Sequence, residues 1–287
     1  IIWTGANVWK NATGYNLTQL IVGSEGTLAV ITKIVLKLIQ HPTQDLLMLV
    51  PFYNAEDACR AVTSILKAGI TPSGLEFMER DALTWTQEFL NDTSIEVKDN
   101  HAAHLLIEVD GFDSEILMNE CTEIMTVLES YETDEVLFAE SQSQKDKLWK
   151  LRRSVGEAVK ANSIYKEEDT VVPRFELATL LSHVKRIGLE FGFKSVCYGH
   201  AGDGNLHVNI IKGDMSDDAW NNELTIAIRE LFTEVVKLGG TLSGEHGIGL
   251  VQKPYMDIAF KSKSIDLMRN IKSVFDPNGI LNPGKIF

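Results

Sequence analysis

Two glycine-rich stretches hold most of the side chains that could do chemistry. The first is YGHAGDGNLHVN at 198–209, in which glycines and an aspartate form a tight turn between two extended arms. On the second arm, His207 and Asn209 point to the same side, because side chains alternate along an extended chain. The turn can fold His200 back toward His207, and two adjacent imidazoles can serve as metal ligands. The alternative is an ordinary hairpin with two surface histidines.

The second stretch is SGEHGIG at 243–249, which follows an amphipathic helical segment ending at Gly239-Gly240. Adjacent Glu245 and His246 project to opposite sides of an extended backbone, and the flanking glycines permit close approach. Glu245 fits a third metal ligand, and His246 fits an acid or base beside it. An incidental Glu-His pair in a glycine-rich loop is the alternative. Four such groups in two turns favour the chemical interpretation.

Arg152 is the third candidate, within LWKLRRSV at 148–155. It lies four residues after Leu148 and three before Val155, so it shares the apolar face of a helix. A buried guanidinium needs an anionic partner. That partner is either a structural carboxylate or a substrate carboxylate bound by two hydrogen bonds.

The hydrophobic periodicity predicts the elements that position these residues. Residues 28–38 alternate as a half-buried strand or strand pair, and residues 166–169 read as a charged loop. Strands are expected over 46–52, 74–79, 104–110 and 134–140. Helices are expected over 54–68, 80–90, 113–130, 142–162, 175–190 and 216–238. The order predicts an α+β fold, with an antiparallel sheet and helices packed on one face.

Composition narrows the classes of function. The 287 residues suggest about two domains. A net charge of -13 argues against nucleic acid and anionic membrane as partners, and there is no apolar run of membrane-spanning length. The three cysteines are too far apart in sequence to suggest a disulfide framework. We expect a cytoplasmic protein, and leave peripheral membrane association and a homodimer open.

Taken together, the motifs resemble the FAD-linked oxidases of the vanillyl-alcohol-oxidase superfamily. The similarity is to the branch of D-lactate dehydrogenase, the glycolate oxidase large subunit and D-2-hydroxyglutarate dehydrogenase. It rests on GYNLTQLIVGSEGTLAVIT at 14–32, LWKLR at 148–152, YKEEDTVVPR at 165–174, YGHAGDGNLHVNI at 198–210, SGEHGIG at 243–249 and DPNGILNPGKIF at 276–287. The resemblance implies a cap domain of ferredoxin-like repeats, together with remnants of a PCMH-type FAD-binding domain.

The resemblance also implies roles for individual residues. His200, His207 and Glu245 match divalent metal ligands, and His246 matches the base that takes the substrate hydroxyl proton. Substrate contacts are implied for Arg152, Lys166 and Asn209. Cofactor contacts are implied for Gly14, Tyr15, Gly23, Ser24, Glu25, Gly26, Thr27, Asn205 and Asn282.

The implied activity is oxidation of a D-2-hydroxy acid of the lactate, glycolate or 2-hydroxyglutarate class to the 2-oxo acid. Hydride passes to FAD, a divalent metal binds the substrate, and the electron acceptor is not specified. Zinc suits the ligand set, and manganese or iron also suit it.

One departure from the family is the lack of a glycine-rich FAD-pyrophosphate loop before residue 14, and the chain opens Ile1-Ile2 without an initiator Met. We therefore expect the C-terminal portion of a larger enzyme, inactive by itself. Its expected parts are the end of the FAD domain (1–42), a substrate-binding cap (43–268) and a returning segment (269–287).

Two other functions remain open from the sequence. One is a non-catalytic subunit or metal-binding module with the same fold, although the intact His200, His207, Glu245 and His246 weigh against it. The other is an alkyl-glycerone-phosphate synthase, whose site needs a different histidine-rich stretch that the sequence does not contain.

Overall fold

The computed structural model describes all 287 residues, which form two compact units. The sheet unit comprises residues 41–244, and the terminal unit comprises residues 1–40 together with 245–287. Residues 245–268 thus cluster with the two termini, whereas the sequence grouped them with residues 43–244. The loop SGEHGIG is divided between the units after Gly244.

The sheet unit is built on one seven-stranded sheet of order β4-β1-β3-β2-β6-β7-β5, in which every pairing is antiparallel. This confirms the predicted α+β class with an antiparallel sheet. The strands are β1 (Gln44–Phe52), β2 (Gly74–Glu79), β3 (Ala103–Gly111), β4 (Leu137–Phe138), β5 (Tyr165–Val171), β6 (Lys194–Gly199) and β7 (Asn205–Ile211).

Two halves of the sheet share one topology. The first has the order β4-β1-β3-β2, which is that of a split β-α-β motif. The second repeats it as β5-β7-β6, and Thr241 takes the position of the fourth strand through an isolated bridge to Val171. The fourth strand is short in both halves. In the second half, the chain therefore reaches residues 243–244 beside β5.

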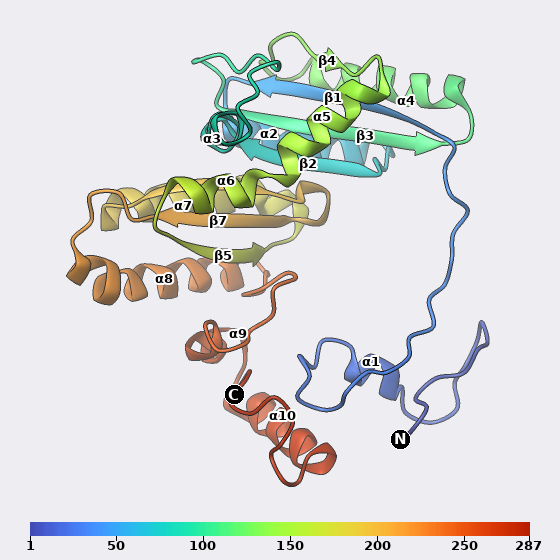
Figure 1. Ribbon diagram of the computed structural model, residues 1–287, viewed down its shortest axis with the longest axis vertical. Coiled ribbons are helices and arrows are strands. Elements are labelled where there is room, and N and C mark those ends of the chain that lie inside the picture. Colours follow the sequence, from blue (N-terminus) through green and yellow to red (C-terminus); the bar gives the residue numbers. More distant parts are fainter. The chain divides into compact units, whose positions relative to one another are not determined.

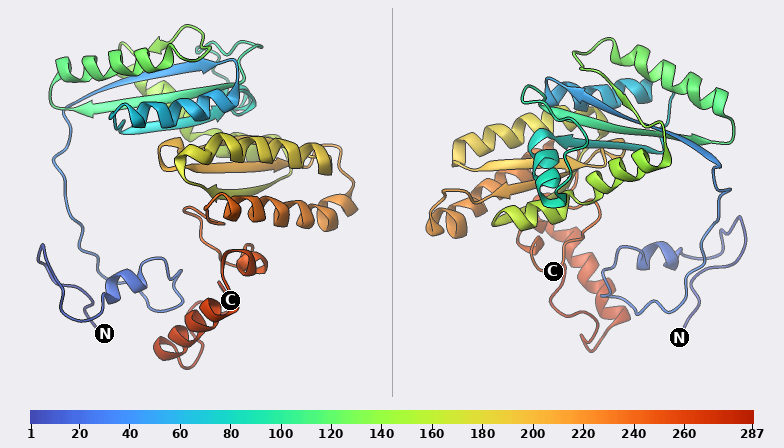
Figure 2. Two further views of the ribbon diagram at one scale, coloured as in Figure 1. Left: turned by 180° about the vertical axis from the view of Figure 1, so that it is seen from behind. Right: turned by 45° about the horizontal axis from the view of Figure 1, so that its top comes forward.

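Helices cover both faces of the sheet, which corrects the expectation that they would lie on one face. One layer contains α2 (Ala55–Lys67), α4 (Ser114–Leu128), α7 (Leu177–Phe191) and α8 (Leu224–Lys237). The other contains α3 (Arg80–Leu90), α5 (Gln142–Arg153) and α6 (Val155–Asn162) (Figures 1 and 2). β2 and β7 are buried along their whole length, so each needs cover on both sides.

Local sequence explains where several helices begin and end. Asn54 caps α2 by accepting the Asp57 N–H, and Asp113 caps α4 in the same way. The helix expected over 142–162 is divided into α5 and α6 at Ser154. The segment expected over 216–238 opens with a π-helical turn, Ala219–Glu223, before α8.

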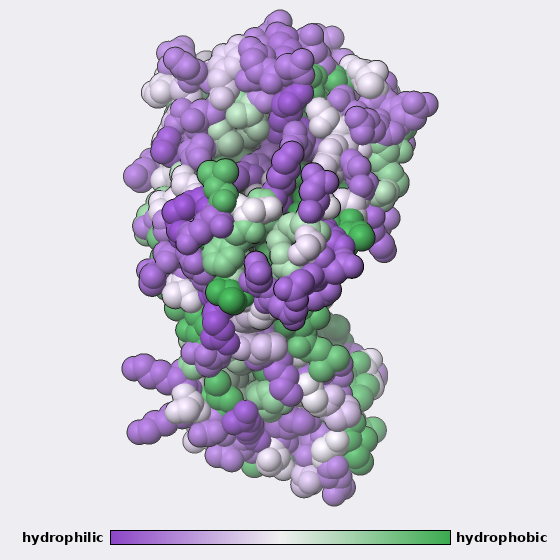
Figure 3. All heavy atoms as spheres, turned by 90° about the vertical axis from the view of Figure 1, so that its left-hand side faces the viewer, coloured by the Kyte–Doolittle hydropathy of each residue, from purple (hydrophilic) through white to green (hydrophobic).

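The hydrophobic core lies in the layers between the sheet and the helices. On the α3, α5 and α6 side it includes Leu47, Leu49, Met78, Leu83, Leu106, Leu148, Leu151, Val155, Val196 and Tyr198. The three cysteines are buried and free. Hydrophilic residues dominate the upper part of the face drawn in Figure 3, and none of the helices combines the length and apolarity needed to cross a membrane.

The terminal unit contains α1 (Leu17–Ile21), α9 (Met256–Ala259) and α10 (Ser262–Phe275). The strand expected over residues 28–38 is absent: the segment has no regular structure, and Val30, Ile34 and Leu36 are exposed. A β-strand forms only when its backbone N–H and C=O groups pair with a neighbour, and this segment has no neighbouring strand in the structure.

Candidate functional site

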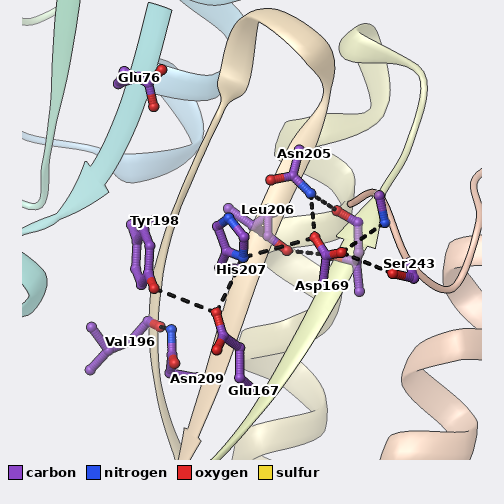
Figure 4. Close-up of polar contacts among 12 residues, drawn as sticks. Glu76, Glu167, Asp169, Val196, Tyr198, Asn205, Leu206, His207, Asn209 and Ser243 are labelled. Carbon is purple, nitrogen blue, oxygen red and sulfur yellow. Dashed lines mark hydrogen bonds and ion pairs between the residues drawn. The ribbon is translucent and has the colours of Figure 1, made fainter. Parts of the chain in front are cut away.

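The site residues of the sheet unit share the sheet face that carries α3, α5 and α6. The register places Tyr198 opposite His207, Asp169 opposite His207, and Glu167 opposite Asn209. Directly opposed residues of antiparallel strands project to the same face. Figure 4 shows the result, with side chains from β5, β6 and β7 converging around the His207 ring.

A tight glycine turn brings His200 to the same place. A Cβ at Gly199 would lie 2.4 Å from the Asn205 carbonyl oxygen, and one at Gly204 would lie 2.1 Å from that of Val172. Gly204 also has a φ of +77°, which only glycine adopts readily. The His200 and His207 ring centroids are 6.1 Å apart, and candidate ligand nitrogens of the two rings lie within 4.8 Å of each other.

Each imidazole has a carboxylate beside its Nδ1. His200 Nδ1 lies 2.8 Å from Glu76 Oε1. His207 Nδ1 lies 3.2 Å from Glu167 Oε1 and 3.8 Å from Asp169 Oδ1. Histidines that bind metals are commonly oriented in this manner, with a carboxylate at one nitrogen so that the ring coordinates through the other.

Glu76 is the carboxylate that pairs with the buried Arg152 guanidinium. Its Oε2 lies 2.9 Å from Arg152 Nε and 2.7 Å from Arg152 Nη2, and both side chains are buried. In the structure, the anionic partner of Arg152 is therefore the Glu76 carboxylate, and contact of Arg152 with a substrate stays a prediction. Burial raises the pKa of Glu76, but the hydrogen bond to His200 and the charge of Arg152 outweigh burial and lower it. Glu76 thus stays ionised and joins Arg152 to His200.

Tyr198 and Asn209 complete the face. The Tyr198 ring stacks on His207 at a centroid distance of 5.0 Å, and its hydroxyl donates to Glu167 Oε1 at 3.5 Å. Burial and the charge of Glu167 raise the pKa of Tyr198. Asn209 is fully buried and donates to the Val196 carbonyl, while its Oδ1 has no hydrogen-bond partner. An unsatisfied buried oxygen carries a desolvation cost.

Asp169 fastens the start of the second glycine-rich loop to this face. It accepts from Ser243 Oγ at 3.0 Å and from the Gly244 N–H at 2.9 Å. A Cβ at Gly244 would lie 2.5 Å from Val171 Cγ2, so glycine is needed there. Asn205, for which the resemblance implied a cofactor contact, also donates to Asp169, at 2.7 Å.

Lys166 does not join these residues. Residues 166–169, expected as a charged loop, belong to β5, where alternation puts Lys166 on the opposite face from Glu167. Its Nζ donates to the Trp220 carbonyl at 3.2 Å and lies over the Trp220 ring. Four residues near the two histidines are not predicted from the sequence as members of the site: Glu76, Glu167, Asp169 and Tyr198. Treating 165–171 as a strand would have revealed the two from β5.

In the terminal unit, Glu25 holds the loop that carries His246. Its carboxylate accepts the N–H groups of Ile248 and Gly249, each at 2.8 Å. Gly247 has a φ of +80°, and a Cβ there would lie 2.9 Å from the Glu25 carboxyl group. The Asn282 side chain donates to the Glu25 carbonyl. Glu25 and Asn282 therefore position the loop after Glu245.

The remaining residues with implied cofactor contacts form a turn and its flank. Thr27 is buried and its hydroxyl donates to the Ser24 carbonyl, whereas Gly14 and Tyr15 are exposed. Gly23 and Gly26 belong to the same terminal unit, whereas Asn205 belongs to the sheet unit. Their contacts with a cofactor stay a prediction. In the sheet unit, the donor atoms suit a divalent metal, because the imidazoles of His200 and His207 lie side by side with carboxylates next to them.

Comparison with known proteins gives the same family as the motifs. The family model for the C-terminal domain of FAD linked oxidases matches residues 41–286. A D-lactate dehydrogenase of Anaerostipes hadrus is 34% identical over 100% of this chain and 61% of its own length. Glycolate oxidase subunit GlcD of Bacillus subtilis is also 34% identical, over 100% of this chain and 60% of its own. A D-2-hydroxyglutarate dehydrogenase of Stutzerimonas stutzeri is 32% identical over 97% and 60%.

Solved structures share the fold at lower identity. A 4-ethylphenol oxidase from Gulosibacter chungangensis superposes with a TM-score of 0.61 at 16% identity, covering 87% of this chain and 55% of the oxidase. An alkyldihydroxyacetonephosphate synthase gives 0.56 at 19% identity, covering 96% and 50%. The chain spans about three fifths of the length of these curated relatives. It belongs to the FAD linked oxidases, and residues 41–286 are their C-terminal domain.

Proposed function

We propose that the chain is the C-terminal part of a flavin- and metal-dependent dehydrogenase that oxidises a D-2-hydroxy acid to the 2-oxo acid. The observation that carries the proposal is the pair His200 and His207, whose rings lie close together in a member of this family and each have a carboxylate oxygen beside Nδ1. Relatives named for the oxidation of such acids support the substrate class.

In this proposal His200 and His207 bind the cation, with Glu245 as the third ligand. Glu245 follows Gly244 directly, and Gly244 is bonded to Asp169, the strand neighbour of His207. Chain connectivity therefore favours Glu245 as the added ligand. Zinc suits two imidazoles and one carboxylate, and manganese or iron accept the same donors. A divalent cation, when bound there, lowers the pKa of a coordinated hydroxyl group.

The other residues orient the substrate and move its proton. Asn209, which lies on the same face of β7 as His207, is the proposed polar contact of the substrate. His246 takes the hydroxyl proton, held in place by the contacts of Glu25 with the same loop. Arg152 acts through Glu76, which orients His200. Flavin, when bound, supplies the hydride acceptor.

The test uses the full-length protein that contains this chain. Its metal content is measured by elemental analysis, and oxidation of D-lactate, glycolate and D-2-hydroxyglutarate is followed with a dye acceptor. Wild type is expected to bind a divalent metal and to oxidise at least one of these acids, and His207→Ala to lose both properties. His183→Ala, which changes a partly exposed histidine on α7, is the matched control and should keep both. A wild type with neither metal nor turnover would favour the non-catalytic alternative.

A further inference from the structure

The alternation of β5 gives the candidate site a charge opposite to the one expected from the sequence. Lys166 was expected beside a substrate carboxylate, but it lies on the other face, against Trp220. Its neighbour Glu167 occupies the His207 face instead, directly across from Asn209. A carboxylate therefore stands where a substrate-binding cation was expected.

Glu167 lies among the groups that a substrate would contact. Its Oε1 is 3.2 Å from His207 Nδ1 and 3.5 Å from the Tyr198 hydroxyl. The Glu167 side chain is 25% exposed, compared with 5% for His207. A substrate held at His207 would therefore lie beside this carboxylate (Figure 4).

The charged groups of residues 41–244 around the two histidines oppose a second anionic group on a substrate. Three carboxylates surround His200 and His207, from Glu76, Glu167 and Asp169. The guanidinium of Arg152 is neutralised by Glu76. A bound divalent cation can balance the first carboxylate of a 2-hydroxy acid, but a second carboxylate beside Glu167 would meet a like charge.

We propose that Glu167 determines substrate specificity by repelling a second carboxylate, so that the enzyme uses monocarboxylic 2-hydroxy acids in preference to dicarboxylic ones. This inference rests on the proposed function. It narrows the implied substrates, which are of the lactate, glycolate or 2-hydroxyglutarate class, to the monocarboxylic ones.

The test compares wild-type full-length protein with Glu167→Gln, which keeps the shape and removes the charge, and with Glu167→Lys. For each protein, kcat/KM is measured for D-lactate and for D-2-hydroxyglutarate. The Kd values of pyruvate and 2-oxoglutarate are measured by calorimetry, which does not depend on turnover. Glu123→Gln, on an exposed position of α4, is the matched control.

Wild type should prefer the monocarboxylates in both measurements. Glu167→Gln should shift both ratios toward the dicarboxylates by about tenfold, as expected for loss of one like-charge contact, and Glu167→Lys should shift them further. Glu123→Gln should leave the ratios unchanged. If D-lactate is oxidised but neither Glu167 variant shifts the ratios, or if wild type prefers dicarboxylates, the role of Glu167 is wrong and the proposed function stands. If no 2-hydroxy acid is oxidised and no 2-oxo acid binds, both proposals fall.

Discussion

Two pairs of histidines occupy comparable places in the two halves of the sheet. His104 lies in β3, the third strand of the first half, with His101 just before that strand. His207 lies in β7, the third strand of the second half, with His200 in the turn before it. Both pairs make edge-to-face ring contacts, at 5.1 Å and 6.1 Å between centroids. Ring proximity therefore does not distinguish a structural pair from a candidate metal site.

The carboxylates distinguish the two pairs. In the first, Asp134 contacts His101 and Lys98, while neither ring nitrogen of His104 has a hydrogen-bond partner and the residue is fully buried. Burial and the neighbouring His101 lower the pKa of His104 to about 3, so it packs as a neutral ring. In the second, a carboxylate oxygen lies beside Nδ1 of each ring, at 2.8 Å for His200 and 3.2 Å for His207, and 41% of the His200 side chain is exposed. Two histidines that bind a metal need rings held in a fixed orientation and a side chain that the ion can reach from solvent.

The largest expected effect comes from removing one histidine of each pair. In the full-length protein, His207→Ala should reduce kcat/KM by at least about 10³-fold, because metal coordination contributes several kcal/mol to the transition state. His104→Ala should retain the metal and lose about 2 kcal/mol of stability through the cavity. Elemental analysis, steady-state kinetics and urea unfolding measure the three quantities. If His104→Ala loses the metal and His207→Ala retains it, the metal site belongs to the first pair of histidines and not to the second.

The second expected effect concerns the carboxylate behind His200. Glu76→Gln leaves the Arg152 guanidinium buried without its charged partner, which should cost about 3 kcal/mol in urea unfolding. It should also weaken metal binding by about 10- to 100-fold, because His200 loses its orienting carboxylate. Asp134→Asn, which affects the first pair, is the matched control and should leave metal affinity unchanged. Equal metal affinity in wild type and Glu76→Gln would show that Glu76 has no role in metal binding.

The third prediction uses the low pKa of His104. Its folded-state pKa of about 3 lies below the unfolded value, so the unfolded chain binds the proton more tightly between these two values. The contribution of His104 to stability is thus present above pH 6.5 and is lost as the pH falls toward 3. Between pH 7 and pH 5 the loss should be about 2 kcal/mol. His104→Leu should remove this part of the pH dependence while leaving Asp134, Lys98 and His101 in place. The measurement is the free energy of unfolding of both proteins between pH 7 and pH 5. An equal decrease in the two proteins would contradict the prediction.

Much of the fold could be predicted because local signals and tertiary packing agree. β2 and α3 were predicted with the bounds that the structure shows, since strand periodicity changes to helical periodicity at Glu79. Residues 28–38 have an equally clear apolar alternation but form no strand. A strand needs a pairing partner, and periodicity within one segment does not show whether a partner is available.

The site was predictable only where the chain itself brings residues together. The glycines of residues 199–204 constrain the turn, so the approach of His200 to His207 follows from local sequence. Glu76 lies more than 120 positions from His200, and no motif links the two. The pairing of Arg152 with Glu76 was likewise undetermined, because a sequence shows that a buried guanidinium needs an anion but not which one.

The smallest expected effect, from Lys166→Gln, tests the alternation argument directly. Because Lys166 lies on the face opposite His207, the Kd of pyruvate should change less than twofold in the full-length protein. Stability should fall by about 0.5–1 kcal/mol, since the variant loses the hydrogen bond to the Trp220 carbonyl and the contact with its ring. Calorimetry and urea unfolding give the two values. A tenfold weaker affinity for pyruvate would indicate that Lys166 lies on the same face as His207. That placement would require a register of β5 different from the one in the sheet.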